Sequence, residues 1–351
     1  MSAAALAELD VLSEASQRPD AAAVAAMALE RYGMQGSLSP LSGERDCNYL
    51  LQPDDGRRYM LKVSHPRETP LVADFQTQAL LHVARVAPDL PVQRIVPARA
   101  GEPCFTWRAP DGQQRMVRMF GYLTGTPLPD APRTALQRIR LARTLARLDA
   151  ALAGFDHPAG ELALPWDIQR ADSVRGLLGD IGDAGRRALA EEALAGFEQH
   201  ARPRLPGLRR QPIHNDLNIH NVLVGAEDSD RIAGILDFGD MVKAPLINDL
   251  AVACAYQLGV EGDTLADVLP FVAAYHAVLP LTADEIDLLF DLMLARLTMV
   301  VAISGWRARC HPENAAYLMR NNAASWSRLA GCLRIGRRAA GLRLRLACGM
   351  Q

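Results

Sequence analysis

Two polar side chains bracket a short β-hairpin that the sequence predicts in the middle of the chain. The apolar runs Val222–Val224 and Ile232–Leu236 are separated by a polar turn, so they can pair as antiparallel strands. Such pairing brings Asn221, just before the first strand, next to Asp237, just after the second. An amide oxygen and a carboxylate are hard ligands of the kind that Mg²⁺ prefers.

Asp216 lies on the loop that leads into the same end of this hairpin. The oxygens of Asp216, Asn221 and Asp237 should therefore face one small volume. This arrangement fits phosphoryl transfer from a nucleotide, because metal ions neutralise the phosphates while a separate carboxylate accepts the proton of the attacking hydroxyl. We expect Asp216 to be that catalytic carboxylate and Asn221 and Asp237 to be the metal ligands. His214 is expected to brace the loop by hydrogen bonding.

The amino-acid composition indicates a globular protein and argues against some other classes. Of the 351 residues, 49% are hydrophobic and 22% are charged, as in globular proteins that bury a full core. The net charge of −2 argues against a nucleic-acid-binding domain, and no uncharged apolar run is long enough for a membrane helix. The six cysteines lie far apart, which is typical of reduced thiols. With no secretory signal in view, we expect a cytoplasmic enzyme.

The elements that must position these residues change along the chain. A helix is expected over Ala21–Tyr32, followed by a hairpin of Asn48–Leu51 and Tyr59–Val63 and a helix from Thr69 to Val86. Further strands are expected at Gln93–Val96, Cys104–Trp107 and Gln114–Met119. Beyond Gly121 the pattern becomes mainly helical, with expected helices at Leu136–Ala153, Ala171–Leu178, Gly185–Ala201, Asp249–Leu258, Leu265–Ala277 and from Ala283 onward.

The predicted fold class is α+β with two lobes. We expect an N-terminal helical extension over residues 1–35, a small lobe with an antiparallel sheet over residues 36–120, and a larger, mainly helical lobe over residues 121–351. A ligand would bind in the cleft between the two lobes.

The central motifs resemble a known family. His214-Asn-Asp-Leu-Asn-Ile-His-Asn221, followed by Asp237-Phe-Gly239, resembles the catalytic-loop and metal-loop pair of kinases. Because no arginine precedes Asp216, the first motif is similar to that of the aminoglycoside phosphotransferase and choline kinase group rather than that of protein kinases. The resemblance extends over about residues 41–275 and is supported by segments at Val117–Leu128, Gly234–Asp240 and Pro245–Ala251. The runs Leu41–Asn48 and Phe238–Met241 look most like the hydroxylysine kinase branch.

This resemblance implies a protein-kinase-like fold and a small-molecule kinase that uses Mg²⁺ and ATP or GTP. The implied acceptor is a hydroxyl of a small amine-bearing molecule, with 5-hydroxylysine or a related amino alcohol first. Aminoglycoside, homoserine and choline-type acceptors are the alternatives. A catalytically silent nucleotide-binding regulator is an alternative of another class, against which the intact Asp216, Asn221 and Asp237 count.

The resemblance also implies the nucleotide site. Lys62 matches the strand lysine that contacts the α- and β-phosphates. Centring the hairpin turn near residues 54–55 places Lys62 opposite about Cys47, close to the loop with Ser42 and Gly43, which we expect to cover the phosphates. The hinge from Met119 to Leu123 is expected to contact the purine.

The family lysine is normally paired with a glutamate on the following helix. No glutamate occurs between Thr69 and Val86. Gln76 and Gln78 lie on opposite flanks of the apolar face and either can reach Lys62, while alignment with the family favours Gln76. A neutral amide would hold the lysine by a hydrogen bond instead of an ion pair.

Three further carboxylates have two interpretations each. Asp240 and Asp167 could meet a cationic substrate near the cleft, although a helix cap or a backbone brace explains them equally well. Asp249 precedes an apolar helix, so we expect it to be the N-cap of that helix or a structural brace.

Overall fold

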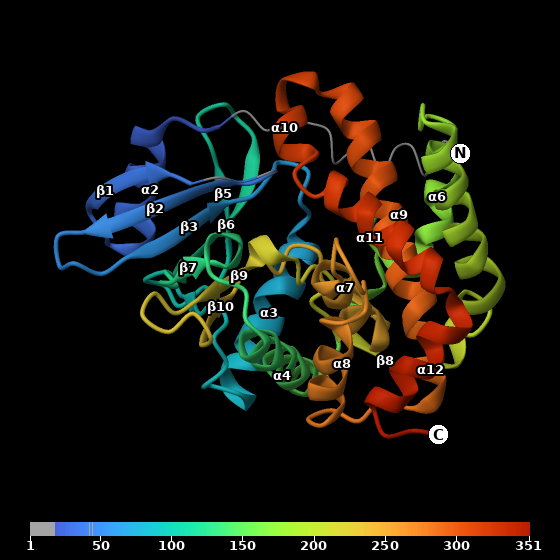
Figure 1. Cartoon of the computed structure of the whole chain (residues 1–351). Coiled ribbons are helices and arrows are strands. Elements are labelled where there is room, and N and C mark those ends of the chain that lie inside the picture. Colours follow the sequence, from blue (N-terminus) through green and yellow to red (C-terminus); the bar gives the residue numbers. More distant parts are fainter. Residues whose placement is uncertain (1–17, 42, 44) are drawn as a thin grey trace.

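The computed structural model describes residues 18–41, 43 and 45–351, which form two lobes (Figure 1). The smaller lobe is built on an antiparallel sheet in which β3 and β6 are central and β5 pairs with β6 alone. The order of the other strands is β1 (Gly36–Pro40), β2 (Cys47–Pro53), β3 (Tyr59–Val63), β6 (Gln114–Gly121) and β4 (Ile95–Val96), and β5 spans Phe105–Arg108.

Helix α2 (Ala21–Tyr32) packs against one face of this sheet and has the predicted ends. The Asp20 side chain accepts a hydrogen bond from the backbone N–H of Ala23 at 3.2 Å, and Gly33 ends the helix with a φ of 70°. A left-handed φ suits glycine at a helix C-terminus, since it has no Cβ. The apolar side of α2 joins the core of the small lobe through Val24 and Met27.

Helix α3 (Pro70–Val86) lies between the sheet and the large lobe (Figure 1). Thr69 caps it, since its side chain accepts a hydrogen bond from the N–H of Val72. Phe75, Ala79 and Val83 on α3 are buried in the same apolar cluster as the core of the large lobe. The helix therefore joins the two lobes by hydrophobic packing.

The large lobe is mainly helical and forms around α9, which packs against α6, α7, α11 and α12. Almost every residue in the first twenty of α9 is buried, as expected for a helix surrounded by others. The helices are α4 (Ala135–Leu152), α5 (Arg175–Leu178), α6 (Ala184–Gly196), α7 (Ile247–Gln257), α8 (Val268–His276), α9 (Ala283–Cys310), α10 (Ala315–Leu318), α11 (Asn322–Ile335) and α12 (Arg337–Ala347).

The predicted central hairpin is present as β9 (Val222–Val224) and β10 (Ile232–Ile235), and β7 (Thr126–Pro127) pairs with β9. A second pair, β8 (Arg210–Ile213) with β11 (Val242–Pro245), was not expected from the sequence. Both strands of that pair contain a proline, which the ladder of a central strand disfavours. This pair matters because β8 leads into the loop at residue 214 and β11 follows the loop that begins at residue 237.

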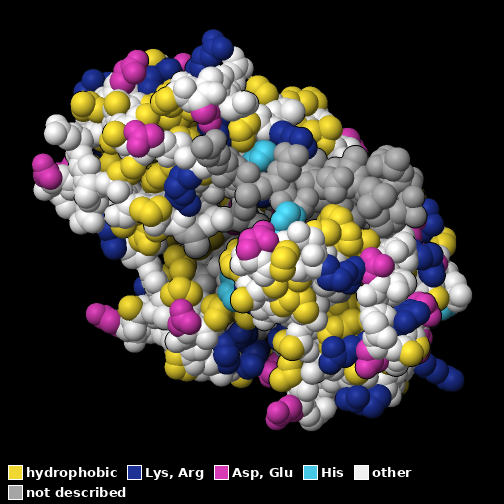
Figure 2. All heavy atoms as spheres, turned by 90° about the horizontal axis from the view of Figure 1, so that it is seen from above, with side chains coloured by type: hydrophobic (Ala, Val, Ile, Leu, Met, Phe, Trp, Pro, Cys, Tyr) yellow, Lys and Arg dark blue, Asp and Glu magenta, His cyan; other side chains and the backbone are white. Residues whose placement is uncertain are grey.

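The α+β fold with two lobes is thus confirmed. On the face drawn in Figure 2, basic and acidic side chains are interspersed over both lobes, in keeping with the small net charge. Within the described ranges, no helix is both long and apolar enough to cross a membrane.

Candidate active site

The buried carboxylate of Asp249 holds the loop that carries Asp216. Asp249, in the first turn of α7, accepts the backbone N–H of His214 at 2.9 Å and that of Asn215 at 2.7 Å. Asn215 adopts a φ of 64°, a left-handed conformation that these hydrogen bonds help to maintain. The brace predicted for Asp249 is confirmed. The N-cap interpretation is wrong, because Leu246 occupies the cap position and Asp249 lies inside the helix.

His214 braces the loop, as predicted. Its Nδ1 accepts the backbone N–H of Asp216 at 3.2 Å, so Nε2 carries the proton and donates to the carbonyl of Leu236 at 2.9 Å. The imidazole edge also packs on the ring of Phe238, with the ring centres 4.7 Å apart. One neutral imidazole therefore joins the loop of Asp216 to the segment that carries Asp237.

The carboxylate of Asp216 is fixed at both oxygens. Oδ1 forms an ion pair with the guanidinium of Arg296 at 2.9 Å, and Oδ2 accepts from the amides of Asn218 at 2.9 Å and Asn221 at 2.8 Å. Burial raises the pKa of Asp216 above its ordinary value, although the charge of Arg296 opposes the rise. Sequence reasoning missed Arg296, whose one signal was that it is the lone charge in the apolar run from Leu292 to Trp306.

Asn221 and Asp237 converge as the hairpin geometry predicts. The N–H of Leu236 donates to the carbonyl of Asn221 at 2.8 Å, which places the two ends of the hairpin side by side. The Asn221 amide nitrogen donates both to the carbonyl and to the side chain of Asp216, so its oxygen is turned the other way. Asp237 has a φ of 57°, and 57% of its side chain is exposed in the cleft.

These two side chains offer the donors that Mg²⁺ prefers, one amide oxygen and one carboxylate. Among the described residues, no three His, Cys, Asp or Glu side chains form a group that could hold a metal alone. Mg²⁺ is commonly held by one or two carboxylates together with substrate phosphates and water. The residues present therefore fit a magnesium ion that completes its coordination with a nucleotide, and their role as ligands stays a prediction.

Lys62 is paired differently from the prediction. Its Nζ lies 2.8 Å from the carboxylate of Asp46 and 3.8 Å from that of Asp237. Burial alone would lower the pKa of Lys62, but these two carboxylates outweigh burial and raise it above its ordinary value. On the β2 side of the ladder, the residue opposite Lys62 is Asn48, one position from the expected Cys47.

The prediction that a glutamine on the following helix holds Lys62 is wrong. Gln76 is 4% exposed and its side-chain oxygen accepts from Arg118 at 2.6 Å, while the half-buried Gln78 donates to Asp74. The partner is instead Asp46, which immediately precedes β2 and lies beside the end of β3. The sequence feature that could have identified Asp46 is a carboxylate directly before the strand that pairs with the strand of Lys62.

The phosphate-covering loop is described in part. Ser42 lies outside the described residues. A Cβ on Gly43 would come within 2.5 Å of the carbonyl oxygen of Asp46, so only glycine permits this close approach to the partner of Lys62. Contact of Gly43 with phosphate stays a prediction.

The hinge side chains divide between two faces of the sheet. Met119 is fully buried opposite Leu61 in the core of the small lobe, on the face away from Lys62. Strand alternation turns the Met119 side chain toward α2, so only the backbone of Met119 could contact the purine, and that contact stays a prediction. Leu123, half-buried beside Gly234, keeps its predicted place at the hinge.

A polar pocket of about 90 Å³ adjoins Asp216 on the side of the large lobe. Asp240 lines it, whereas Asp167 does not. Asp167 instead caps a helical turn by accepting the backbone N–H of Gln169 at 3.0 Å, which agrees with the helix-cap interpretation of this residue. The lining residues include both acids and bases, namely Trp166, Asp216, Asn218, Asp240, Tyr256, Arg296, Val300, Ser304, Arg307, Tyr317, Leu318, Arg320 and Asn321.

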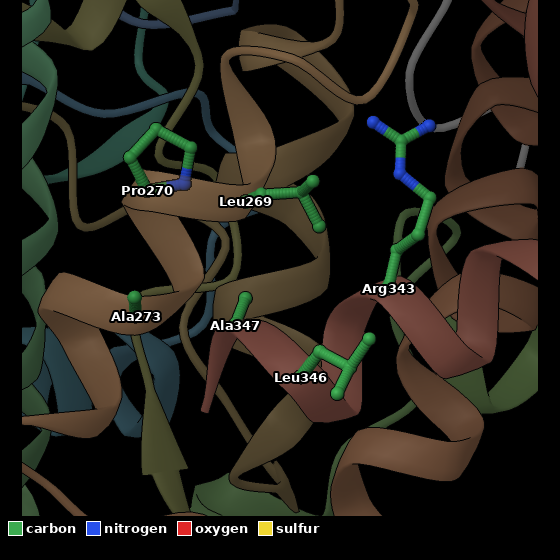
Figure 3. A pocket seen from close by; sticks show the side chains of 6 residues that line it. All are labelled: Leu269, Pro270, Ala273, Arg343, Leu346 and Ala347. Carbon is green, nitrogen blue, oxygen red and sulfur yellow. The ribbon is translucent and has the colours of Figure 1, made fainter. Parts of the chain in front are cut away.

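A more open groove lies between α8 and α12 (Figure 3). Its lining is apolar except for one arginine and consists of Leu269, Pro270, Ala273, Arg343, Leu346 and Ala347. Arg343 is already paired with Asp263. Since the groove offers neither a carboxylate nor a metal ligand, we place the chemistry in the polar pocket beside Asp216.

A second buried acid supports Asp249 from α4. The hydroxyl of Tyr275 donates to Asp149 Oδ2 at 2.5 Å, and the other oxygen of Asp149 is buried with no hydrogen bond from a protein donor. Burial raises the pKa of Asp149 well above its ordinary value, and the neighbouring Asp249 raises it further, against a smaller effect of Arg209. The raised pKa favours the protonated form of Asp149, which can donate a hydrogen bond to Asp249.

This geometry agrees with comparisons to known proteins. A model of the phosphotransferase enzyme family matches residues 37–286, more than half of the chain. The chain belongs to that family. It is a small-molecule phosphotransferase whose acceptor is an alcohol group.

Curated relatives support the predicted resemblance. Hydroxylysine kinase of Mus musculus is 26% identical over 352 residues, and the match covers 93% of each protein. Hydroxylysine kinase of Danio rerio is 27% identical, covering 82% of this chain and 84% of that protein. Homoserine kinase of Cupriavidus necator is 30% identical, covering 70% of this chain and 72% of that protein.

Solved structures agree on the fold. A microcompartment-associated aminopropanol kinase has a TM-score of 0.71 at 22% identity, covering 92% of this chain and 99% of that chain. Amicoumacin kinase, solved in complex with AMP-PNP, Ca²⁺ and Ami, has a TM-score of 0.66 at 14% identity, covering 86% of this chain and 93% of that chain. The predicted kinase-like fold is confirmed.

We expect the substitution Asp149→Asn to remove a pH-dependent loss of stability. A raised pKa means that Asp149 takes up a proton on folding, so its contribution to the free energy of unfolding is complete below the ordinary pKa of 3.8 and is lost as the pH rises through the raised value. The loss is about 1.4 kcal/mol per pH unit for one proton. Asparagine keeps the donor to Asp249 and the acceptor for Tyr275 without this proton.

Chemical denaturation of both proteins at about pH 6 and about pH 9 measures the difference. The wild type should lose more stability than Asp149→Asn over this interval. Equal losses would show that Asp149 does not carry the proton.

Proposed function

We propose that the protein transfers the γ-phosphoryl group of ATP or GTP, with Mg²⁺, to the hydroxyl of 5-hydroxylysine or of a closely related hydroxy amino acid. The observation that carries this proposal is the position of Asp216, which lies between the Asn221–Asp237 pair and the acceptor pocket. The similarity to hydroxylysine kinases over most of the chain supports this acceptor.

In the proposed reaction, the acceptor hydroxyl oxygen attacks the γ-phosphorus, the bond from that phosphorus to the β–γ bridging oxygen breaks, and the hydroxyl proton passes to Asp216. The three hydrogen-bonding partners of Asp216 hold its carboxylate in place, which favours a positioned base. Its raised pKa brings it closer to neutral pH, where a general base is more effective. Mg²⁺ held by Asn221 and Asp237 would supply positive charge that offsets the phosphate charge.

Lys62 adds a second positive charge on the nucleotide side of the cleft. It is buried and held by Asp46, so little reorganisation is needed when a phosphate approaches. The proposed nucleotide position is therefore between Lys62 and the Asn221–Asp237 pair.

The charges of the acceptor pocket favour a zwitterion. Asp240 and the Trp166 ring both line the pocket and offer a site for an ammonium group. Arg307 near the end of α9 and Arg320 before α11 offer sites for a carboxylate. A hydroxy amino acid carries both groups, whereas choline and aminoglycosides carry no carboxylate.

The size of the pocket points the same way. Pockets for drug-sized ligands occupy roughly 300–1,000 Å³, and this one encloses about 90 Å³. An acceptor with few heavy atoms is favoured over a multi-ring aminoglycoside. Homoserine meets the same charge pattern and is the second candidate, supported by the similarity to homoserine kinases.

The proposal is tested with purified protein, Mg²⁺, ATP or GTP, and four acceptors: 5-hydroxylysine, homoserine, choline and an aminoglycoside. We expect the highest kcat/KM with 5-hydroxylysine. Asp216→Asn should lower kcat by about 10²- to 10⁴-fold because it removes the proton acceptor, while nucleotide binding, which Asp216 does not mediate in this proposal, should stay intact. Asp183→Asn, at the N-cap of α6, is the matched control.

Nucleotide binding with no turnover on any acceptor would contradict the proposal and favour the silent regulator. Turnover that persists in Asp216→Asn would exclude Asp216 as the base. A preference for homoserine would retain the reaction and replace the acceptor.

Arg320→Gln tests the carboxylate site separately. We expect the KM for 5-hydroxylysine to rise about tenfold with little change in kcat, since a charge-assisted hydrogen bond to the bound carboxylate is lost. The KM for 5-hydroxylysine should not change in Arg309→Gln, because Arg309 is exposed and paired with Asp180. An unchanged KM in Arg320→Gln would refute this carboxylate contact.

A further inference from the structure

Gln76 contacts both the nucleotide-binding sheet and the loop that carries Asp237, whose relative position matters for the proposed reaction. Its side-chain oxygen accepts from Nη1 of Arg118 at 2.6 Å, and its side-chain nitrogen donates to the carbonyl of Gly239 at 3.1 Å. The residue is 4% exposed, so neither contact competes with bulk water. One amide thus joins strand β6 to the loop that carries Asp237.

The arginine at one end of this contact is itself firmly placed. Arg118 is 1% exposed and lies directly across the ladder from Lys62. Its Nη2 pairs with the carboxylate of Glu68 at 2.8 Å and donates to the hydroxyl of Ser64 at 3.2 Å. A buried guanidinium requires such partners, so its position is fixed by the sheet and by the residues before α3.

The carbonyl at the other end belongs to the segment that shapes the metal loop. The N–H of Gly239 donates to the carboxylate of Asp237 at 3.1 Å, while the N–H of Asp237 donates to the side chain of Gln93 at 3.2 Å. Asp237 is held in the left-handed region that non-glycine residues rarely adopt. Holding the Gly239 carbonyl therefore constrains where the Asp237 carboxylate points.

Only an amide can make both contacts at once. A carboxylate at position 76 could accept from Arg118, but it has no hydrogen to donate and would face the Gly239 carbonyl with a negative charge. This explains why α3 carries a glutamine where related kinases carry a glutamate. Asp46 pairs with Lys62 in this chain, so position 76 is available for another contact.

We propose that Gln76 is a positioning residue that couples the nucleotide-binding sheet to the metal loop and so sets the affinity for the Mg²⁺–nucleotide complex. This inference rests on the proposed function, in which Asp237 holds the metal. It assigns Gln76 no contact with substrate and no part in proton transfer.

The test compares Gln76→Glu with Gln78→Glu. The first keeps an acceptor for Arg118 and loses the donor to Gly239, whereas Gln78 is half-buried on the same helix and donates to Asp74. Isothermal titration calorimetry measures ATP binding as a function of Mg²⁺ concentration, with no acceptor present. We expect Gln76→Glu to raise the half-saturating Mg²⁺ concentration about tenfold and Gln78→Glu to leave it unchanged.

Two additional readouts separate positioning from general stability. The melting temperature of Gln76→Glu should match or exceed that of the wild type, because the acid strengthens the contact with Arg118. In steady-state assays its KM for the nucleotide should rise while the KM for the acceptor stays constant. Wild-type Mg²⁺ dependence in Gln76→Glu, or an equal shift in Gln78→Glu, would overturn the proposal.

The titration does not depend on the identity of the acceptor. If the wild type binds Mg²⁺–ATP but phosphorylates none of the acceptors, the proposed function fails while the role of Gln76 is still decided. If Gln76→Glu behaves as the wild type while 5-hydroxylysine is phosphorylated, the coupling fails and the proposed function stands.

Discussion

The active-site loop depends on one buried carboxylate that faces backbone amides rather than substrate. Asp249 accepts hydrogen bonds from two consecutive N–H groups and so holds Asn215 in a left-handed conformation. A buried charge of this kind is stable only when it is well paired, so α7 must lie beneath the loop whenever the lobe is folded. Behind Asp249 lies Asp149, whose pKa is raised by burial and by the charge of Asp249 and whose protonated form can donate a third hydrogen bond. The orientation of Asp216 follows from this arrangement.

Each charge of the cleft has its own buried or half-buried partner. Lys62 is held by Asp46, and Asp216 is held by Arg296, whose side chain is 2% exposed. Neither pair joins the sheet to the loop of Asp216, so each lobe orders its own charged groups. The connections between the lobes include hydrophobic packing of α3, the amide of Gln76, the contact of Lys62 with Asp237 and the hydrogen bond from Asp237 to Gln93. Electrostatic catalysis requires charged side chains that are already in place before the substrate binds, because they then need little reorganisation during the reaction.

Local signals in the sequence predicted the elements near the site well. The turn and flanking apolar runs predicted the hairpin between Asn221 and Asp237, and the starts of the helices expected from Ala21 and from Thr69 agree with the structure to within one residue. What the sequence could not supply was pairing between distant segments. The partner of Asp216 comes from a helix 80 positions later, and no local pattern links Arg296 to the loop.

Strand alternation and register decided the remaining differences. A resemblance identifies which residues lie near the hinge, but a side chain such as Met119 faces the core or the cleft according to its ladder position. Likewise, the family pattern assigns the partner of Lys62 to a helix, whereas the register of β2 and β3 brings Asp46 closer. Which side chain pairs with Lys62, and which way Met119 faces, is decided by segments that meet only in the folded chain. A local sequence pattern does not contain this information.

The central claim is that Asn221 and Asp237 jointly hold the metal of the nucleotide complex. The most direct measurement is the affinity for ATP with and without Mg²⁺, by calorimetry, in the wild type and in Asp237→Ala. The account predicts that Mg²⁺ tightens ATP binding in the wild type and that this gain disappears in the variant. An undiminished gain in Asp237→Ala would contradict the account, because the metal would then be bound elsewhere.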